Sequence, residues 1–342
     1  MQHGSANGHK LTMQQSMARA FARQFRTRDF ILPTWIEKKL LADFQPQSDG
    51  IKMPLVAIVG PPRVGSTLMY QILASNTNCF FFDNLQHTLL RYPYLGFYLS
   101  ERFFTRDTGG LKSDHGFISG IGGMSEGNFF WPFWFDMHIE QKTPQPVDQR
   151  VQHVRRVFNK IYDQTKMPMV SSFNSHAFYL AELAKQFPSL VIVNMRREPV
   201  ANAVSLLRGR REIIGDIDTW WSIRPADCVE SRYPDPYSQI VCQIGKVYKS
   251  VKQQRGLIPH VPVIDVNYSD LCENPRQVFD QILSACDMAG IDLALRFDEP
   301  SIPDLKESGP RAAEAEDVVI FKTLIEQVDW DDLWSNNGGT AV

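Results

Sequence analysis

The stretch Pro54-Leu55-Val56-Ala57-Ile58-Val59-Gly60-Pro61-Pro62-Arg63-Val64-Gly65-Ser66-Thr67 decides the fold. It begins with a short continuous apolar run that ends at a glycine, which is typical of a strand buried on both faces of a parallel sheet. From Ser66 to Ser75 the apolar residues recur at helical spacing and predict a helix. The sequence therefore predicts a strand, a glycine-rich loop and a helix in direct succession.

The same alternation of strand and helix recurs further along the chain. Apolar runs at 169–172, 190–195 and 262–266 predict three more strands. Helices are expected after each of them, and the one at 277–286 follows the last strand. Strands that alternate with helices favour an α/β fold of three layers, built on a doubly wound parallel sheet.

Length and composition narrow the class of protein. Of the 342 residues, 43% are hydrophobic and 22% are charged, as in globular proteins. Lys and Arg number 36 against 38 Asp and Glu, so the net charge of -2 gives no general attraction to nucleic acid or to an anionic membrane. No apolar run approaches the roughly 18 residues of a membrane span, and the N-terminus lacks the apolar centre of a signal peptide. A cytoplasmic protein that binds no nucleic acid is expected, and its oligomeric state is left open.

The chain is expected to form a single domain over residues 1–342, because no repeat or linker interrupts it. Residues 1–50 are predicted to be an N-terminal helical extension outside the core, interrupted at Pro33. Residues 92–145 lose the periodic pattern and are too long for a plain connection. They are predicted to be an irregular insertion that forms part of a binding site.

The cysteines indicate neither a disulfide framework nor a zinc site. They are odd in number and widely spaced, and none forms a Cys-x-x-Cys pair. All five are therefore expected to be reduced and structural, as in most intracellular proteins. They are Cys79, Cys228, Cys242, Cys272 and Cys286.

The loop 60–67 is predicted to bind phosphate. It joins a strand to the start of a helix, where backbone N–H groups and the helix dipole attract anions. The glycine spacing fits the Walker A pattern, but Ser66 stands where that pattern has the lysine that reaches the β- and γ-phosphates. Arg63 instead supplies the positive charge from the loop, which favours a nucleotide held through one 5′-phosphate. The alternative is a tight turn whose glycines serve packing alone.

The segment Pro61-Pro62-Arg63-Val64-Gly65-Ser66-Thr67-Leu68 resembles the 5′-phosphosulfate loop of sulfotransferases that use PAPS, 3′-phosphoadenosine-5′-phosphosulfate. The likeness is to the bacterial and Golgi type, which has Arg where cytosolic members have Lys. It implies a P-loop-like sulfotransferase fold and a loop in which Pro62, Arg63, Val64, Gly65, Ser66 and Thr67 bind the donor.

A second motif of this family follows about 130 residues later. Val191-Ile-Val-Asn-Met-Arg-Arg197-Glu-Pro199 ends a predicted strand in Arg-x-Pro, and Ser205 follows eight residues after Arg197. The resemblance implies that Arg197 and Ser205 hold the 3′-phosphate. An arginine fork and a hydroxyl can converge on one phosphate in this way. Taken without the loop, Arg196 and Arg197 would be read as an ordinary solvated pair.

The resemblance extends over residues 54–287 and includes Tyr268-Ser-Asp-Leu271 near its end. Two features depart from it. Asn174 stands near the position where many members have a lysine, and 306–311 is only a weak match to the late loop over the 3′-phosphate. The family needs no metal for sulfuryl transfer, and none is expected here.

The resemblance also implies a base that deprotonates the acceptor. Asn84 falls where some relatives have glutamate, and an amide cannot take a proton. The candidates are Asp83, His87 and, in the insertion, Glu126. Each has a plainer interpretation: Asp83 as a helix N-cap, His87 as a surface histidine and Glu126 as a loop carboxylate.

The acceptor is expected to be a small molecule or a glycan that presents a hydroxyl or amine. It could be a carbohydrate, a lipid head group or a small natural product. The segment 128–136 holds six aromatic residues, which either pack in the core or form a wall of the acceptor pocket, and Trp220 and Trp221 allow the same two interpretations. Two other functions are kept as alternatives: a P-loop phosphoryl-transfer kinase, and a nucleotide-binding interaction module without catalysis.

Overall fold

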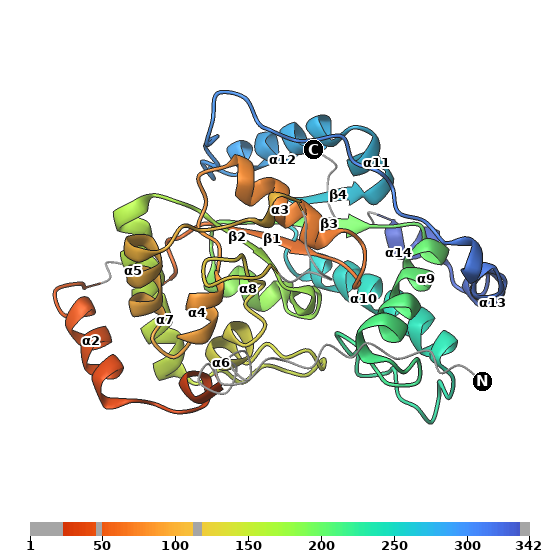
Figure 1. Ribbon diagram of the computed structural model, residues 1–342, viewed down its shortest axis with the longest axis horizontal. Coiled ribbons are helices and arrows are strands. Elements are labelled where there is room, and N and C mark those ends of the chain that lie inside the picture. The colour runs from red at the N-terminus through yellow and green to blue at the C-terminus, as the bar shows by residue number, and fades with distance from the viewer. Residues whose placement is uncertain (1–22, 46–49, 112–117, 336–342) are drawn as a thin grey trace, which may run out of the picture.

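Four parallel strands form the centre of the molecule (Figure 1). The structure is a computed structural model that describes residues 23–45, 50–111 and 118–335. The order in the sheet is β2-β1-β3-β4, so β1 and β3 are the inner strands. All four predicted strands are confirmed, within one or two residues at their ends. They are β1 (Leu55–Val59), β2 (Met169–Ser172), β3 (Leu190–Arg196) and β4 (Val263–Asn267).

Helices cover both faces of this sheet. Those before β2 are α2 (Ile31–Leu41), α3 (Ser66–Asn76), α4 (Asn84–Thr88), α5 (Pro93–Phe103), the short η1 (Gly109–Leu111), α6 (Phe130–Phe135) and α7 (Asp148–Thr165). Those between β2 and β4 are η2 (Asn174–Phe178), α8 (Leu180–Gln186), α9 (Pro199–Gly209), the π-helical turn η3 (Arg210–Ile214) and α10 (Pro236–Leu257). The last ones are α11 (Tyr268–Glu273), α12 (Pro275–Met288), η4 (Ala312–Glu314), α13 (Ala315–Ile325) and α14 (Trp330–Trp334).

Alternate residues of each strand enter two separate hydrophobic clusters. In β1, Leu55 and Ala57 pack with α7, α8 and α10 on one face, whereas Val56 and Ile58 pack with α3 and α12 on the other. Successive side chains of a strand point to opposite faces, so a strand apolar at every position must be covered on both. The predicted three-layer α/β architecture is therefore confirmed.

The insertion 92–145 is more regular than the sequence predicts. It contains α5, which begins at Pro93 in the first helical position, and the short helix α6. α5 is rich in Tyr, Phe and Leu, so its apolar residues show no clear helical period. Aromatic residues are also weak helix formers, a preference that tertiary packing overrides here. Residues 112–117 of the insertion lie outside the described residues.

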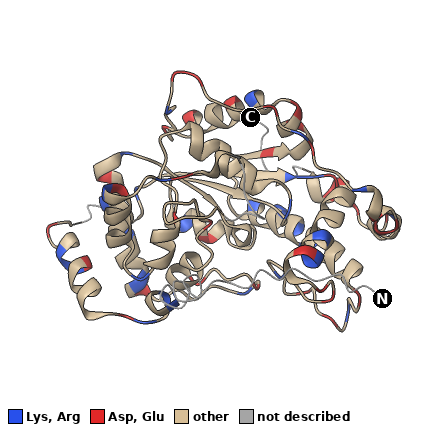
Figure 2. Ribbon diagram, in the orientation of Figure 1, with Lys and Arg blue, Asp and Glu red and all other residues tan. Residues whose placement is uncertain are grey.

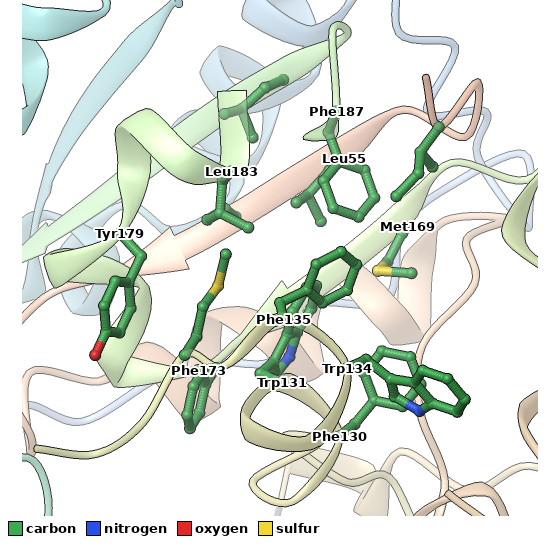
Figure 3. Packing of buried hydrophobic residues seen from close by; sticks show 14 of the residues in the cluster. Leu55, Phe130, Trp131, Trp134, Phe135, Met169, Phe173, Tyr179, Leu183 and Phe187 are labelled. Atoms are coloured by element: carbon green, nitrogen blue, oxygen red, sulfur yellow. The ribbon is translucent and has the colours of Figure 1, made fainter. Parts of the chain in front are cut away.

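Most of the aromatic residues in 128–136 belong to the core. Phe130, Trp131, Trp134 and Phe135 are buried on α6, and Figure 3 shows Trp131 and Phe135 close to Phe187. The ring centroids of both residues lie 6.2 Å from that of Phe187. The packing interpretation thus holds for the helix and anchors the insertion to the sheet.

The N-terminal extension is helical but not separate from the core. Among its described residues, Pro33 lies within the first turn of α2, where the backbone N–H groups have no partner inside the helix, so the helix continues through it. The buried Glu37 carboxylate accepts hydrogen bonds from the N–H groups of Tyr94 and Leu95, at 3.1 and 2.6 Å, and so fixes α2 against the start of α5. Residues 1–22 and 46–49 lie outside the described residues.

The expectation that all five cysteines are reduced is wrong for one pair. Cys228 and Cys242 form a disulfide, whereas Cys79, Cys272 and Cys286 are free and buried. The cause is tertiary: α10 brings Cys242 beside the segment that precedes it, and 14 residues of separation carry no recognised motif.

Charges of both signs are interspersed along the helices (Figure 2), in keeping with a net charge of -2. Among the described residues, no helix is long and apolar enough to span a membrane.

Candidate functional site

A pocket of about 810 Å³ lies where the four strands end. Each strand contributes the residues that follow its carboxyl end, which is the usual place for a ligand in an open α/β sheet. The loop after β1, Asn174 after β2, Arg197 after β3 and Tyr268 after β4 all line it. The other lining residues come from the insertion and from the segments 221–223 and 308.

The loop 60–67 turns through residues in the left-handed backbone conformation. Arg63 and Gly65 have positive φ angles of 70° and 93°, a conformation that a residue with a side chain adopts rarely. A Cβ on Gly65 would lie 2.5 Å from the Tyr268 ring, and one on Gly60 would lie 2.6 Å from the Met195 carbonyl oxygen. Glycine at both positions therefore lets the loop lie close to β3 and α11.

Arg63 and Arg197 lie together across the loop. Arg197 Nη1 donates to the Arg63 carbonyl oxygen at 2.7 Å, and Arg63 Nε donates to Ser205 Oγ at 3.3 Å. Burial lowers the pKa of both guanidinium groups, and the charge of Arg197 lowers that of Arg63 further. Neither side chain has a carboxylate partner among the described ion pairs, so the charge of each is without a counter-ion there.

Arg196 has a different role from its neighbour. It pairs with Asp265 at 2.8 Å and donates to the Trp334 carbonyl oxygen. Arg196, the last residue of β3, thus has a structural role, whereas the next residue, Arg197, lines the pocket.

The segment 306–311 reaches the same place. Arg197 Nη2 donates to both the carbonyl oxygen and the hydroxyl of Ser308, while its guanidinium lies 4.5 Å over the Tyr268 ring. Ser308 also exchanges a hydrogen bond with the Tyr268 hydroxyl at 3.3 Å. The weak sequence match therefore lies beside the residues predicted to hold the 3′-phosphate. Sequence reasoning gave no role to Ser308, which lies in an irregular segment.

Among the three candidate bases, Glu126 lines the pocket. Backbone hydrogen bonds from Ser125 N–H to the Phe82 oxygen and from Asn84 N–H to the Gly123 oxygen bring this part of the insertion beside the segment 82–84 that leads into α4. Thr67 Oγ1 then donates to Glu126 Oε1 at 2.9 Å. Burial raises the pKa of Glu126 to about 7, against the opposing effect of this hydrogen bond.

Asp83 lies away from the pocket and is fully buried. Its carboxylate caps α4 by accepting from the Gln86 N–H at 2.8 Å, and it also accepts from the Ser100 hydroxyl. Arg106 Nε lies 3.9 Å away. Burial raises the pKa of Asp83, and its contacts are those of the predicted N-cap.

His87 is also outside the pocket lining. Its Nδ1 is 3.1 Å from Ser125 Oγ, and its ring lies 5.1 Å from that of Phe129. Burial, with a contribution from Arg26, lowers the pKa of His87 to about 4. The imidazole supports the wall of the pocket from behind.

Sequence reasoning missed one polar pair on the pocket wall. His138 lines the pocket, and its Nε2 lies 2.7 Å from Asp136 Oδ1. Asp136 ends α6 in a left-handed conformation and also binds Lys142 Nζ at 3.1 Å. The Asp-x-His spacing was the signal, but it stands in a run of aromatic residues that drew attention to packing.

Asn174 takes the place where a lysine was expected. It follows β2, lines the pocket and accepts a 3.4 Å hydrogen bond from the Ser66 hydroxyl. Within the described parts of the chain, no three His, Cys, Asp or Glu side chains are grouped as a metal site requires.

Comparisons with known proteins agree with this architecture. Residues 54–292 match the model of the sulfotransferase family. The sulfotransferase STF9 from Mycobacterium avium has a similar fold: the TM-score is 0.50 at 15% identity, over 80% of this chain and 72% of that one. For the sulfotransferase STF1 from Mycobacterium tuberculosis H37Rv the TM-score is 0.49 at 15% identity, over 94% of this chain and 88% of that one. No curated protein matches the sequence significantly. The family model matches well over half of this chain, and the chain therefore belongs to the sulfotransferase family.

Proposed function

We propose that the protein transfers a sulfuryl group from PAPS to a hydroxyl or amine of a small-molecule or glycan acceptor. The observation that carries this proposal is the pair of Arg63 and Arg197. The half-buried Arg63 lies in the phosphate loop and the buried Arg197 lies beside it, and neither has a carboxylate partner among the described ion pairs. A nucleotide with phosphates at both the 5′ and 3′ positions complements such a pair.

The donor would be held from two sides. The backbone N–H groups of the loop, with Pro62, Val64 and Gly65 setting its shape, bind the 5′-phosphosulfate together with Ser66, Thr67 and Arg63. Arg197 and Ser205 bind the 3′-phosphate. Ser205 already contacts Arg63, so the two phosphate sites are neighbours in the folded protein.

Glu126 is proposed as the base. The acceptor oxygen forms a bond to sulfur, its proton passes to a carboxylate oxygen of Glu126, and the bond between sulfur and the bridging oxygen breaks. The electron pair of that bond goes to the 5′-phosphate of the product PAP, 3′-phosphoadenosine-5′-phosphate. Arg63 and the loop N–H groups stabilise this growing charge. A base with a pKa near 7 is well matched to proton transfer at neutral pH.

The insertion is proposed to form part of the acceptor site, within one domain that includes residues 1–342. Glu126, Phe129 and His138 of this insertion line the same pocket as the phosphate loop. The other two candidates, Asp83 and His87, are proposed to have structural roles. Asp83 caps α4, and His87 packs against Phe129.

Thermal stability with added nucleotides tests the proposal. A ligand that binds only the folded state raises its stability with concentration. PAP should stabilise the protein strongly, and ATP should do so weakly, because Ser66 replaces the lysine of kinases. Transfer of labelled sulfate from PAPS then separates an enzyme from a binding module. R197A should weaken PAP binding. Among the described ion pairs the exposed Arg276 is paired with Asp280, outside the pocket lining, so R276A is a matched arginine control.

A further inference from the structure

Among the described residues, the charged side chains that line the pocket are Arg63, Arg197 and Glu126. In the proposed function the two arginines bind the donor and Glu126 takes the proton. His138 also lines the pocket and is already paired with Asp136. A charged acceptor would therefore lose its hydration without gaining an ion pair.

Apolar residues make up much of the rest of the lining. Phe129, Pro132, Ile139 and Trp221 are exposed or half-buried, whereas Phe173 and Ile223 belong to the core beneath them. Phe129 and Ile139 are 52% and 42% exposed, so their apolar surface faces solvent when the pocket is empty. Exposed apolar surface that rims a pocket is typical of a binding site for an apolar ligand.

Two distant segments are joined into one continuous wall. Arg224 N–H donates to the Ile139 oxygen at 2.7 Å, and Gln141 N–H donates to the Arg224 oxygen at 2.9 Å. Gln243 Nε2 donates to the carbonyl oxygens of Trp221 and Ile223, at 3.0 and 2.6 Å. These bonds satisfy the backbone of the wall, so the surface that it offers a ligand is chiefly that of its side chains.

Phe129 is held in place although it is exposed. The Arg26 guanidinium lies 4.8 Å from its ring centroid, and His87 lies 5.1 Å away on an edge-to-face contact. A ring that is fixed before the ligand arrives loses little conformational freedom on binding.

Few polar groups of the lining remain to recognise a sugar. Beyond the phosphate loop and Arg197 with its neighbours Tyr268 and Ser308, the uncharged polar residues are Asn128, His138, Asn174 and Ser222. Of these, His138 is engaged with Asp136, and Asn174 accepts from Ser66. A saccharide would bury many hydroxyl groups, and each one left without a partner costs binding energy. An acceptor that presents a single hydroxyl next to Glu126 does not need several hydrogen-bonding partners.

We infer that the acceptor is an uncharged alcohol on a largely apolar body, such as an alkyl, alicyclic or aromatic alcohol, and not an oligosaccharide. This inference rests on the proposed function and narrows its acceptor class. The apolar body packs on the wall of Phe129, Ile139 and Trp221, and its hydroxyl reaches Glu126.

The test uses the full chain saturated with PAP. Decanol, cyclohexanol and 2-naphthol form one panel, and glucose, maltotriose and choline form the other. Additional thermal stabilisation of the PAP complex measures acceptor binding, and labelled sulfate from PAPS measures transfer. We expect the first panel to bind and to be sulfated at least 10-fold more efficiently than the second, as kcat/KM.

Variants locate the effect on the wall. I139S, which changes a pocket residue that is 42% exposed, should lower kcat/KM for the alcohols at least 10-fold and leave the affinity for PAP unchanged. L257A, which changes an exposed residue at the end of α10 outside the pocket lining, should change neither.

The outcomes separate the inference from the function on which it rests. If PAP fails to stabilise the protein, the proposed function is wrong and the inference falls with it. If PAP binds but the alcohols neither bind nor accept sulfate, or the saccharides or choline are preferred, the inference alone is overturned.

Discussion

The Thr67 hydroxyl donates a hydrogen bond of 2.9 Å to Glu126 Oε1 and so joins the phosphate loop to the insertion 92–145. One residue comes from the first turn of α3, and the other lies 59 residues later. This contact brings a carboxylate to the loop where the sulfuryl group of the donor is expected. It also links the occupancy of the loop to the position of the proposed base.

Substitution E126Q should lower turnover by roughly 100-fold or more and leave PAP binding nearly intact, because an amide cannot accept the proton. In the wild type, turnover should rise as Glu126 loses its proton around pH 7. Rates measured from pH 5 to 9 check both statements. D83N and H87N serve as comparisons and should keep most of the turnover per folded molecule. A variant E126Q with wild-type turnover would exclude Glu126 as the base.

The same carboxyl group should make stability depend on pH. The pKa of Glu126 in the folded protein is about 7, above its ordinary value of 4.5, because burial disfavours the charged form. Its contribution to stability is therefore full below pH 4.5 and is lost as the pH rises through 7. We expect E126Q to melt at a higher temperature than the wild type at pH 8, and at the same temperature at pH 4. Equal melting temperatures at pH 8 would show that Glu126 is well solvated.

Substitution R63A should reduce turnover more than it weakens PAP binding. The charge of Arg63 matters most when the leaving phosphate gains charge, and loss of one such group costs roughly 100- to 1000-fold in comparable sites. Turnover at saturating PAPS and the dissociation constant of PAP are the two measurements. If affinity collapses while turnover survives, Arg63 only anchors the nucleotide.

Reduction of the Cys228–Cys242 disulfide should weaken acceptor binding and leave PAP binding unchanged. Cys242 precedes Gln243, whose side chain holds the Trp221 and Ile223 carbonyls of the pocket wall. The acceptor KM should rise with dithiothreitol or in the C228S/C242S variant. The chain-entropy model gives a loss of about 3 kcal/mol in unfolding free energy for a loop of this length.

An unchanged KM in both conditions would show that Gln243 holds the wall unaided.

The cytoplasmic location expected from the sequence stays a prediction. In a reducing compartment the pair would be a dithiol, so the reduced protein is the relevant form there.

The sequence predicted those features of the fold that depend on residues close together along the chain. The strands were placed to within one or two residues, because strands buried on both faces read as apolar runs bounded by glycine or proline. The loop at Arg63 was predicted from the strand and helix on either side of it, and Arg197 and Ser205 from the family resemblance. The structure brings the three residues into contact, and their roles in binding the donor stay predictions.

Contacts between distant segments were not accessible in this way. Ser308 reaches Arg197 from an irregular segment 111 residues away, and no local period marks such an approach. The choice of Glu126 over Asp83 depends on how the insertion folds back along Phe82, which its composition does not encode. The Cys228–Cys242 pair depends likewise on the position of α10.

The most direct measurement is the affinity of wild type and R197A for PAP and for adenosine 5′-monophosphate, which lacks the 3′-phosphate. The account predicts that R197A weakens PAP binding by roughly 2 to 4 kcal/mol, because a charge-assisted contact is lost, and that binding of the monophosphate barely changes. R276A should bind both nucleotides like the wild type. An equal loss for both nucleotides in R197A would contradict the account, because Arg197 would then maintain the site as a whole and not recognise the 3′-phosphate.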